Sequence, residues 1–261
     1  MFYGYWLPNT YYAKHAGPWP ESGYRYLLSF ILEYGVWFWI GLLLVFMVRR
    51  LRDTERFQSL SDRDRAIRLL ALGVLFVQLF YYTFVVGGDH FEFRIYSFLV
   101  PLLFVSAMFL LSRIFRNPRI VPALLVLFVT VSLPIPWTHW FQTRHLETRE
   151  ETFMLIKPIA SMFPSFLKVP VRIWDENQEW LIRHMVGMRH QEHKIAFEYF
   201  ASILPSRKEG SEILWQRRAV IGGDSVGVLG WVLPEVAVID RKGLNDLVIA
   251  RTAISEKRLG S

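Results

Sequence analysis

Four long apolar stretches occupy the first half of the chain and are separated by polar loops. A helix needs roughly 20 apolar residues to cross about 30 Å of hydrocarbon, and three of the four stretches meet that length. The third is shorter and can draw on flanking residues such as Phe91 and Phe115. The pattern predicts a membrane region, residues 1–140, with four transmembrane helices at about 26–48, 67–86, 95–112 and 120–137.

The arginine content of the loops alternates along the chain. The loop after the first stretch carries seven arginines up to Arg68, and the loop after the third carries three, whereas the loop 87–94 carries only Arg94. Short loops rich in Arg and Lys stay in the cytoplasm. We therefore expect residues 1–25, the loop 87–94 and everything beyond Trp137 to lie outside. In a bacterium this describes a multi-pass inner-membrane protein whose N- and C-terminal ends are both extracytoplasmic.

The net charge of +7 does not point to nucleic acid. Much of the excess lies in the two arginine-rich loops, where it would face anionic lipid of the bilayer. We therefore expect a lipid bilayer rather than a nucleic acid as the partner of these charges. The chain has no cysteine, which excludes disulfides and thiolate metal sites.

The pattern of residues 141–261 predicts a small extracytoplasmic α/β domain. The predicted fold class is therefore a membrane region of four helices followed by this domain. A polar helical stretch is broken at Pro158, and a second helix is expected at about 175–187. Residues 193–204 fit a strand or a helix equally well. Short apolar runs bounded by glycine or proline predict strands at 217–223, 227–233 and 235–240, with a closing helix at 244–253.

Two loops on the predicted outer side carry candidate binding chemistry. In LPNTYYAK, residues 7–14, a turn with Asn9 and Thr10 precedes Lys14, which can hold a phosphate as a point charge. The alternative is a capped loop with a lysine that reaches to the headgroups. In GGDHFEFR, residues 87–94, four ionisable side chains follow two glycines: Asp89, His90, Glu92 and Arg94.

The ionisable residues of the loop 87–94 support more than one interpretation. Carboxylate with imidazole can bind a divalent cation or move protons, and Arg94 can hold a phosphate with two nitrogens. Ionisable groups at the edge of a bilayer are costly unless they are paired or used. The alternative is an ion pair of Asp89 or Glu92 with Arg94 that caps the third helix.

Weaker candidates lie elsewhere in the chain. His190, Glu192 and His193 put two imidazoles on one helical face, although surface histidines without a metal explain them equally. Glu33 is an acid inside the first apolar stretch, and it either has a function or reaches headgroup water. Asp240 ends a predicted strand, where it either contacts substrate or caps a turn.

Three segments resemble the C-terminal half of bacterial GT-C-type membrane glycosyltransferases. They are YGYWLPNTYYAK, GGDHFEFRIYSFLVPLL and VIDRKGLNDLVIAR, and they are most similar to the group of the terminal β-(1→2)-arabinofuranosyltransferase. The resemblance implies a polyprenyl-phosphate sugar as donor and an extracytoplasmic cell-envelope glycan as acceptor. In that family the catalytic acid lies in an outer loop ahead of the PNT segment. We therefore expect the catalytic residue to lie outside this chain, in a missing N-terminal half.

The resemblance also assigns expected roles to residues of this chain. The donor would contact two groups of side chains, one from each outer loop: Asn9, Thr10 and Lys14, and Asp89, His90, Glu92 and Arg94. Asp89 and Glu92 would alternatively bind a divalent cation, Mg²⁺, Ca²⁺ or Mn²⁺. The acceptor glycan would contact Trp215, Trp231 and Asp240, since indole rings stack on sugars.

Two other classes of protein compete with the enzyme. One is a non-catalytic membrane protein with a periplasmic domain, involved in assembly or motility, which the expected absence of the catalytic loop favours. The other is a transporter, which is weaker because the polar groups cluster outside the bilayer rather than at its midplane.

Overall fold

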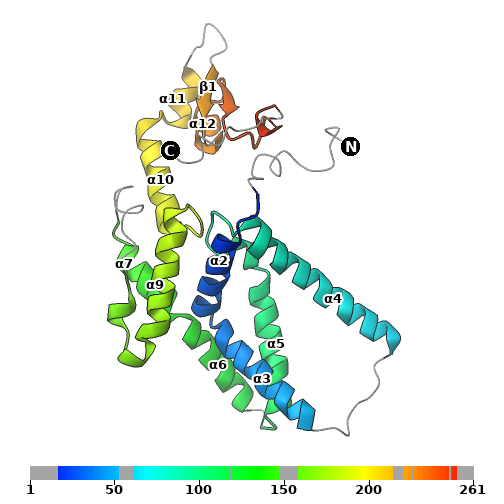
Figure 1. Ribbon diagram of the computed structural model, residues 1–261. Helices are drawn as coiled ribbons and strands as arrows, with labels where there is room; N and C mark the ends of the chain where they lie inside the picture. The colour runs from blue at the N-terminus through cyan, green and yellow to red at the C-terminus, as the bar shows by residue number, and fades with distance from the viewer. Residues whose placement is uncertain are drawn as a thin grey trace. The chain divides into compact units, whose positions relative to one another are not determined.

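The computed structural model describes residues 17–52, 61–117, 119–146, 158–213, 220–224, 226–246 and 248–251. This part of the chain is mostly helical, with a small sheet of two strands (Figure 1). It divides into two compact units, one of residues 18–193 and one that joins 1–17 to 194–261. Each unit is described below by itself.

The first apolar stretch is not one straight helix, as the sequence predicted. Helix α2 (Pro20–Glu33) ends at Tyr34, and α3 (Val36–Arg52) continues at an angle of 80°. Gly35 between them has a φ of 65°, a left-handed conformation that glycine adopts without a steric penalty. This bend places Glu33 at a helix end inside the protein rather than along a straight span.

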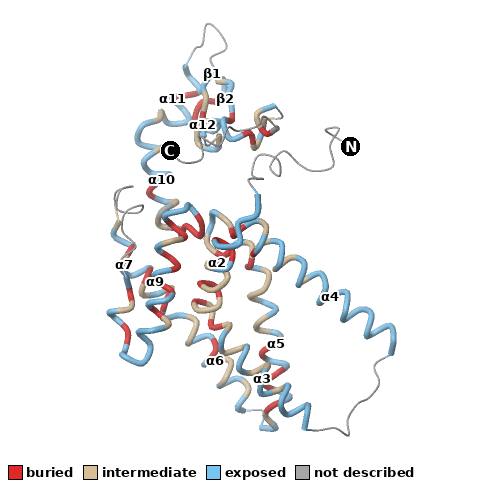
Figure 2. Tube along the Cα trace, viewed as in Figure 1, coloured by how far each residue is buried: buried red, intermediate tan, exposed pale blue. Residues whose placement is uncertain are grey.

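The second apolar stretch forms a single long segment. Helix α4 (Asp62–Phe80) begins at Ser61, whose hydroxyl accepts a hydrogen bond from the backbone N–H of Asp64. A π-helical turn, η1 (Tyr81–Val86), extends it to the glycines of the loop 87–94. Figure 2 shows most of α4 exposed, as expected of an apolar helix that faces lipid.

Three further helices follow the loop 87–94. Helix α5 (Leu99–Ile114) has 16 residues and is the short one, as the sequence predicted. Helices α6 (Ile120–Ser132) and α7 (Pro134–Thr143) form one apolar segment that continues past the expected end at Trp137. Pro134 does not break this segment because it lies in the first turn of α7, where its missing N–H has no partner to lose.

Two segments, Asp62–Val86 and Ile120–Thr143, are long and apolar enough to cross a membrane. The bent pair α2–α3 raises the number to three if it counts as one span, and α5 is apolar but shorter. The helical, membrane-compatible part of the prediction is therefore confirmed, although two to three spans rather than four meet the criterion of length and composition in the described residues.

Residues beyond 158 return to the helices of the first unit. Two 3₁₀ turns, η3 (Ala160–Met162) and η4 (Ser165–Leu167), lead into α9 (Lys168–Arg183), which packs along α2. Helix α9 begins earlier than predicted because Pro170 lies in its first turn and does not interrupt it. The first unit therefore extends to residue 193, and the predicted boundary at 140/141 falls inside it.

An aromatic cluster forms a core of the first unit. Tyr26 and Phe30 of α2 pack against Phe93 and Tyr96 from the segment after the loop 87–94, with ring centroids 5.1–5.5 Å apart. Leu181 and Val186 complete this cluster from the end of α9 and the turn after it. The core thus holds the loop 87–94 between α2 and α9.

The second unit contains the two strands. Strand β1 (Val220–Gly223) pairs in parallel with β2 (Ala237–Asp240), with Val220 opposite Ala237. The predicted strand at 227–233 is wrong, because this segment forms helix α12 (Val226–Val232). Parallel strands require a crossover, and a helix between them supplies it while satisfying its own backbone hydrogen bonds.

Two helices precede the strands, and the first of them begins at the end of the first unit. Helix α10 (His190–Ile203) settles the ambiguous stretch at 193–204 as helical, and α11 (Arg207–Glu212) follows with a Ser206–Glu209 capping box. The predicted closing helix appears in the described residues only as the 3₁₀ turn η5 (Ile249–Arg251). The Asp246 carboxylate accepts hydrogen bonds from the backbone N–H groups of Val248 and Ile249, at the start of this 3₁₀ turn.

Candidate functional site

The loop 87–94 is held in place by backbone hydrogen bonds to the segment after α9. Phe91 and Met188 form a parallel β-bridge. The N–H groups of Gly187 and Met188 donate to the carbonyls of Asp89 and His90 at 2.8 and 2.9 Å. These bonds order a loop that would otherwise be free to move, and they fix the direction of its side chains.

Two glycines let this loop approach α2 closely. Gly87 and Gly88 have φ values of 83° and 104°. A Cβ on Gly88 would lie 3.0 Å from the ring of Tyr26, and one on Gly87 would lie 2.7 Å from the carbonyl oxygen of Trp19. The side chain of Ser22 adds a hydrogen bond of 2.5 Å to the Gly87 carbonyl. Glycine is therefore required at both positions by conformation and by space.

Asp89 and Arg94 form a bidentate ion pair. The guanidinium Nε and Nη2 donate to the two carboxylate oxygens at 2.7 and 3.0 Å. The Asp89 side chain is only 11% exposed, whereas that of Arg94 is 58% exposed and also lies over the ring of Phe91. The pairing is the alternative that the sequence offered for this loop, and it leaves more than half of the Arg94 side chain exposed.

Glu92 pairs with Arg189 rather than with Arg94, and its side chain is 39% exposed. Its carboxylate accepts a hydrogen bond of 2.9 Å from Nη1 of Arg189, and its backbone carbonyl accepts one from the Tyr26 hydroxyl. The two carboxylates of the loop, Asp89 and Glu92, therefore hold different arginines. They do not converge on one point as a shared cation site would require.

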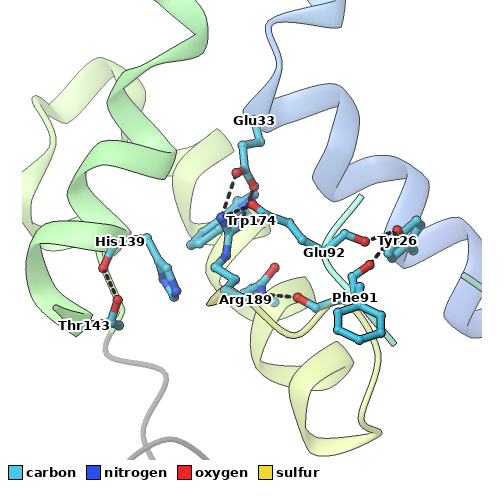
Figure 3. A network of polar contacts seen from close by, with 10 residues as sticks. Tyr26, Glu33, Phe91, Glu92, His139, Thr143, Trp174 and Arg189 are labelled. Carbon is cyan, nitrogen blue, oxygen red and sulfur yellow. Dashed lines mark hydrogen bonds and ion pairs between the residues drawn. The ribbon is translucent and has the colours of Figure 1, made fainter. Parts of the chain in front are cut away.

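Arg189 lies at the centre of a polar group, which we call the Arg189 cluster: Glu33, Glu92, Trp174 and Arg189. All of these side chains are buried except that of Glu92, which is 39% exposed. Its Nη1 and Nη2 donate to the two oxygens of Glu33 at 2.8 and 2.5 Å (Figure 3). Trp174 donates from its indole nitrogen to Glu33 at 3.2 Å, and its ring lies 5.3 Å from the guanidinium carbon. Glu33 does not reach headgroup water, since it is 1% exposed and neutralised within the protein.

The Arg189 cluster joins three parts of the first unit. Glu33 comes from the end of α2, Glu92 from the loop 87–94, and Trp174 from α9. Breaking a buried ion pair by removing one partner costs about 3–5 kcal/mol, because the other charge stays buried. That cost applies to the buried Glu33–Arg189 pair, and the partly exposed Glu92 attaches the loop 87–94 to it.

His139 lies at the edge of the Arg189 cluster, on α7. Its ring centroid is 5.5 Å from that of Trp174, and it is 2% exposed. Its backbone carbonyl accepts a hydrogen bond from the Thr143 hydroxyl, while its Nε2 has no hydrogen-bond partner among the described residues (Figure 3). His139 thus connects the long apolar segment Ile120–Thr143 to the same polar interior.

The imidazoles that the sequence singled out lie beside the loop. Nδ1 of His90 is 2.9 Å from the carbonyl oxygen of Met185. The ring of His193 stacks on Phe91 with centroids 4.3 Å apart, and lies 5.1 Å from that of His90. The side chains of His190 and Glu192 lie outside the described part of the chain. His90 is thus oriented by backbone and aromatic contacts.

A metal site is not evident in the part of the chain that the structure describes. No group of three or more His, Cys, Asp or Glu side chains there has the arrangement of a metal site. Asp89 and Glu92, the expected ligands of a divalent cation, bind Arg94 and Arg189 instead. Each of these two carboxylates therefore already has a cationic partner in the protein.

The remaining predicted contacts fall elsewhere. Asn9, Thr10, Lys14 and Trp215 lie outside the described residues. In the second unit, Asp240 is buried and accepts the backbone N–H groups of Lys242 and Asn245 at 3.0 and 2.9 Å, so its carboxylate caps a turn. Trp231 is 62% exposed, with the Arg207 guanidinium 3.8 Å from its ring centroid.

Asp175, on α9 in the first unit, is a carboxyl group whose pKa is shifted by its surroundings. Its two carboxylate oxygens accept the backbone N–H groups of Ile159 and Ala160, both at 2.9 Å. Burial raises the pKa of Asp175, and the two hydrogen bonds oppose that shift without cancelling it. Asp175 thereby connects the segment before η3 to α9.

Sequence reasoning missed Arg189, Trp174 and His139. Glu33 was the one indication in the sequence that a buried arginine or lysine is present, since an acid buried in an apolar stretch requires a cation as its partner. Nothing local indicated which of the chain's many arginines would supply it. The comparisons add no family: the chain matches no family model, no curated protein and no solved structure.

Proposed function

We propose that this chain is part of a membrane glycosyltransferase that moves a sugar from a polyprenyl-phosphate donor to an extracytoplasmic cell-envelope acceptor. The observation that carries the proposal is the Asp89–Arg94 pair, in which a buried carboxylate orients an exposed guanidinium. The pair follows directly on the span Asp62–Val86, where a membrane lipid presents its phosphate.

The chemistry of glycosyl transfer from a lipid phosphate suits such a group. As the bond from sugar to phosphate breaks, negative charge grows on the departing phosphate. A fixed cation at the edge of a low-dielectric region stabilises that charge without having to reorganise. Arg94 supplies the cation and Asp89 orients it. The ion pair of Glu92 with Arg189 attaches the loop to the Arg189 cluster. The proposal leaves the acid or base of the reaction to a residue outside those described.

The proposed topology is that of the four apolar stretches. It counts the bent pair α2–α3 as one span and the short helix α5 as another, beside the two long segments. It places the loop 87–94, both ends of the chain and the α/β unit outside a bacterial inner membrane. The arginine-rich ends of α3 and α5 then face the cytoplasm, in agreement with the distribution of positive charge.

A specific observation favours a second candidate, a non-catalytic membrane protein for envelope assembly. The carboxylates of Asp89 and Glu92 and the carboxylate of Glu33 all bind arginines. A site built for proton transfer would keep an acid available to substrate, whereas ion pairs of this kind hold elements together. The two candidates differ in whether Arg94 binds a lipid phosphate.

Binding of undecaprenyl phosphate to the purified full chain in nanodiscs distinguishes them. Arg94→Gln removes a charge-assisted hydrogen bond, for which we expect binding weaker by about tenfold to a hundredfold. The matched control is Arg183→Gln, which removes another exposed, ion-paired arginine and should leave binding unchanged. Equal binding by wild type and Arg94→Gln would exclude the phosphate role and leave the assembly protein.

Activity provides the second test. Arg94→Ala expressed in a strain that lacks the native gene should insert in the membrane normally and abolish sugar transfer to the envelope. Transfer at the wild-type level by this variant would remove Arg94 from the mechanism.

A further inference from the structure

A pocket of about 400 Å³ lies between η3 and the exposed side of α9, away from the Arg189 cluster. Lys168 and Arg172 line it from the first turns of α9, and three acids follow within the next two turns: Asp175, Glu176 and Glu179. Ser161 and Ala160 form the opposite wall. Residues spaced by four lie on one face of a helix, so cations and acid follow one another along a single stripe.

Exposed apolar side chains lie close in sequence to Lys168 and Arg172. Phe166 is 78% exposed and Val169 64%, and Met162, Leu167 and Ile173 are also exposed. The turn from η4 into α9 is pale blue in Figure 2. A contiguous exposed apolar surface marks a site of interaction with a protein or a membrane. Because this surface lies beside membrane helices, we infer that its partner is the membrane.

The depth of this turn follows from its packing. Phe163 and Val171 share a buried cluster with Ile135 of α7. Ile135 lies two residues before Trp137, where the sequence predicts that the fourth span ends. Gln142 also donates from Nε2 to the sulfur of Met162 at 2.9 Å. The turn therefore lies alongside the outer end of the predicted span.

Charges at this depth need partners. Among the residues that the structure describes, none forms an ion pair with Lys168 or Arg172. Cations next to hydrocarbon are costly unless an anion or water neutralises them, and long basic side chains reach toward phosphates at the interface. The phosphate of a bilayer lipid meets this need.

We propose that the pocket binds the headgroup of phosphatidylethanolamine in the outer leaflet, with its phosphate on Lys168 and Arg172 and its ammonium on Glu176. The order along the chain matches the order within the lipid: apolar Phe166, then the cations, then the acid. Acyl chain, phosphate and amine follow in the same sequence. This site does not depend on the glycosyltransferase, only on the first unit lying in a membrane.

Native mass spectrometry of the full chain tests the selectivity of the site. We expect wild type to retain phosphatidylethanolamine at least fivefold better than phosphatidylglycerol. Lys168→Ala with Arg172→Ala should lose retention of both lipids, and Glu176→Gln should lose only the preference. The matched control Lys194→Ala with Lys208→Ala removes two exposed lysines elsewhere and should retain the wild-type pattern.

Two results would overturn the proposal. One is equal retention of the two lipids by wild type, and the other is unchanged retention after removal of Lys168 and Arg172. Displacement of the bound lipid by undecaprenyl phosphate, but not by phosphatidylethanolamine, would also overturn it by assigning the pocket to a lipid carrier.

The depth of the turn can be measured independently of any lipid preference. The chain has no cysteine, so single nitroxide labels can be placed without background. A label at Phe166→Cys in nanodiscs should be more accessible to oxygen than to a water-soluble nickel complex, and one at the exposed control Glu212→Cys should show the reverse. A label at position 166 that is as accessible to nickel as the control would place the turn in water and contradict the site.

Discussion

Glu33 and Arg189 lie 156 positions apart in the chain and form a bidentate ion pair, with nitrogen–oxygen distances of 2.8 and 2.5 Å. Both side chains are almost fully buried, at 1% and 5% exposure. Trp174 donates a further hydrogen bond to Glu33, and Glu92 accepts one from Arg189. The pair thereby connects α2 to the segment after α9, on which the loop 87–94 rests.

Removal of one member of this pair should destabilise the protein strongly. Arg189→Met leaves Glu33 as a buried uncompensated charge, for which we expect a loss of about 3–5 kcal/mol in unfolding free energy. The double variant Glu33→Met with Arg189→Met should recover most of that loss, since it buries no charge. Thermal unfolding in detergent measures both. The exposed control Arg183→Met should lower the unfolding free energy by at most about 1 kcal/mol. If Arg183→Met and Arg189→Met lower it equally, the buried ion pair contributes no more than an exposed one.

Gly88→Ala should displace the loop 87–94. The backbone at Gly88 has a φ of 104°, and an added Cβ would lie 3.0 Å from Tyr26 and from Val186. We expect a destabilisation of about 1–3 kcal/mol from backbone strain and overpacking. Gly73→Ala, where a Cβ would meet no atom within 4 Å, is the matched control and should not be destabilised. Equal unfolding temperatures for the two variants would contradict the tight packing described for the loop.

The pH dependence of stability should report on Asp175. Its folded-state pKa is raised above the unfolded value of about 3.9. A raised carboxyl pKa means that the folded state holds the proton more tightly. The stability that this group contributes is therefore fully present below the unfolded pKa and is lost as pH rises through the folded pKa.

Comparison with Asp175→Asn isolates this effect, because the other carboxyl groups are common to both proteins. The stability of wild type relative to Asp175→Asn should be greatest at acid pH, fall as pH rises through the folded pKa, and then stay constant. Unfolding temperatures from pH 3.5 to 7.5 measure the difference. A difference that grows with rising pH would mean that the hydrogen bonds from Ile159 and Ala160 outweigh burial.

Cysteine labelling tests the orientation in the membrane. His90→Cys and Gln58→Cys place single thiols in the loop 87–94 and in the arginine-rich loop, in a chain that has no other cysteine. In intact cells an impermeant maleimide should react at position 90 and not at position 58. After the cells are broken, both should react. Labelling at 58 alone in intact cells would reverse the topology and the proposed function with it.

The helical membrane part was largely predictable from the sequence. Apolar runs as long as 67–86 and 120–137 leave few alternatives to a membrane helix, since lipid demands internally satisfied backbone groups. The bend at Gly35 was not predictable, because a glycine within an apolar run is compatible with a straight helix. The same limit applies to 227–233, where a run of seven residues fits a strand or a helix and the parallel pairing of its neighbours decided for the helix.

The sequence by itself determined which segments are apolar enough to cross a membrane, and that Asp89 and Arg94 are close enough in the chain to pair. Both are local properties, set by composition and by separations of a few residues. Only the tertiary structure decided that Glu33 meets Arg189, and that Glu92 joins Arg189 rather than Arg94. A charge can pair with any opposite charge that the fold brings within about 3 Å, and which one it is depends on how α2 and α9 pack, a relationship that no local pattern records.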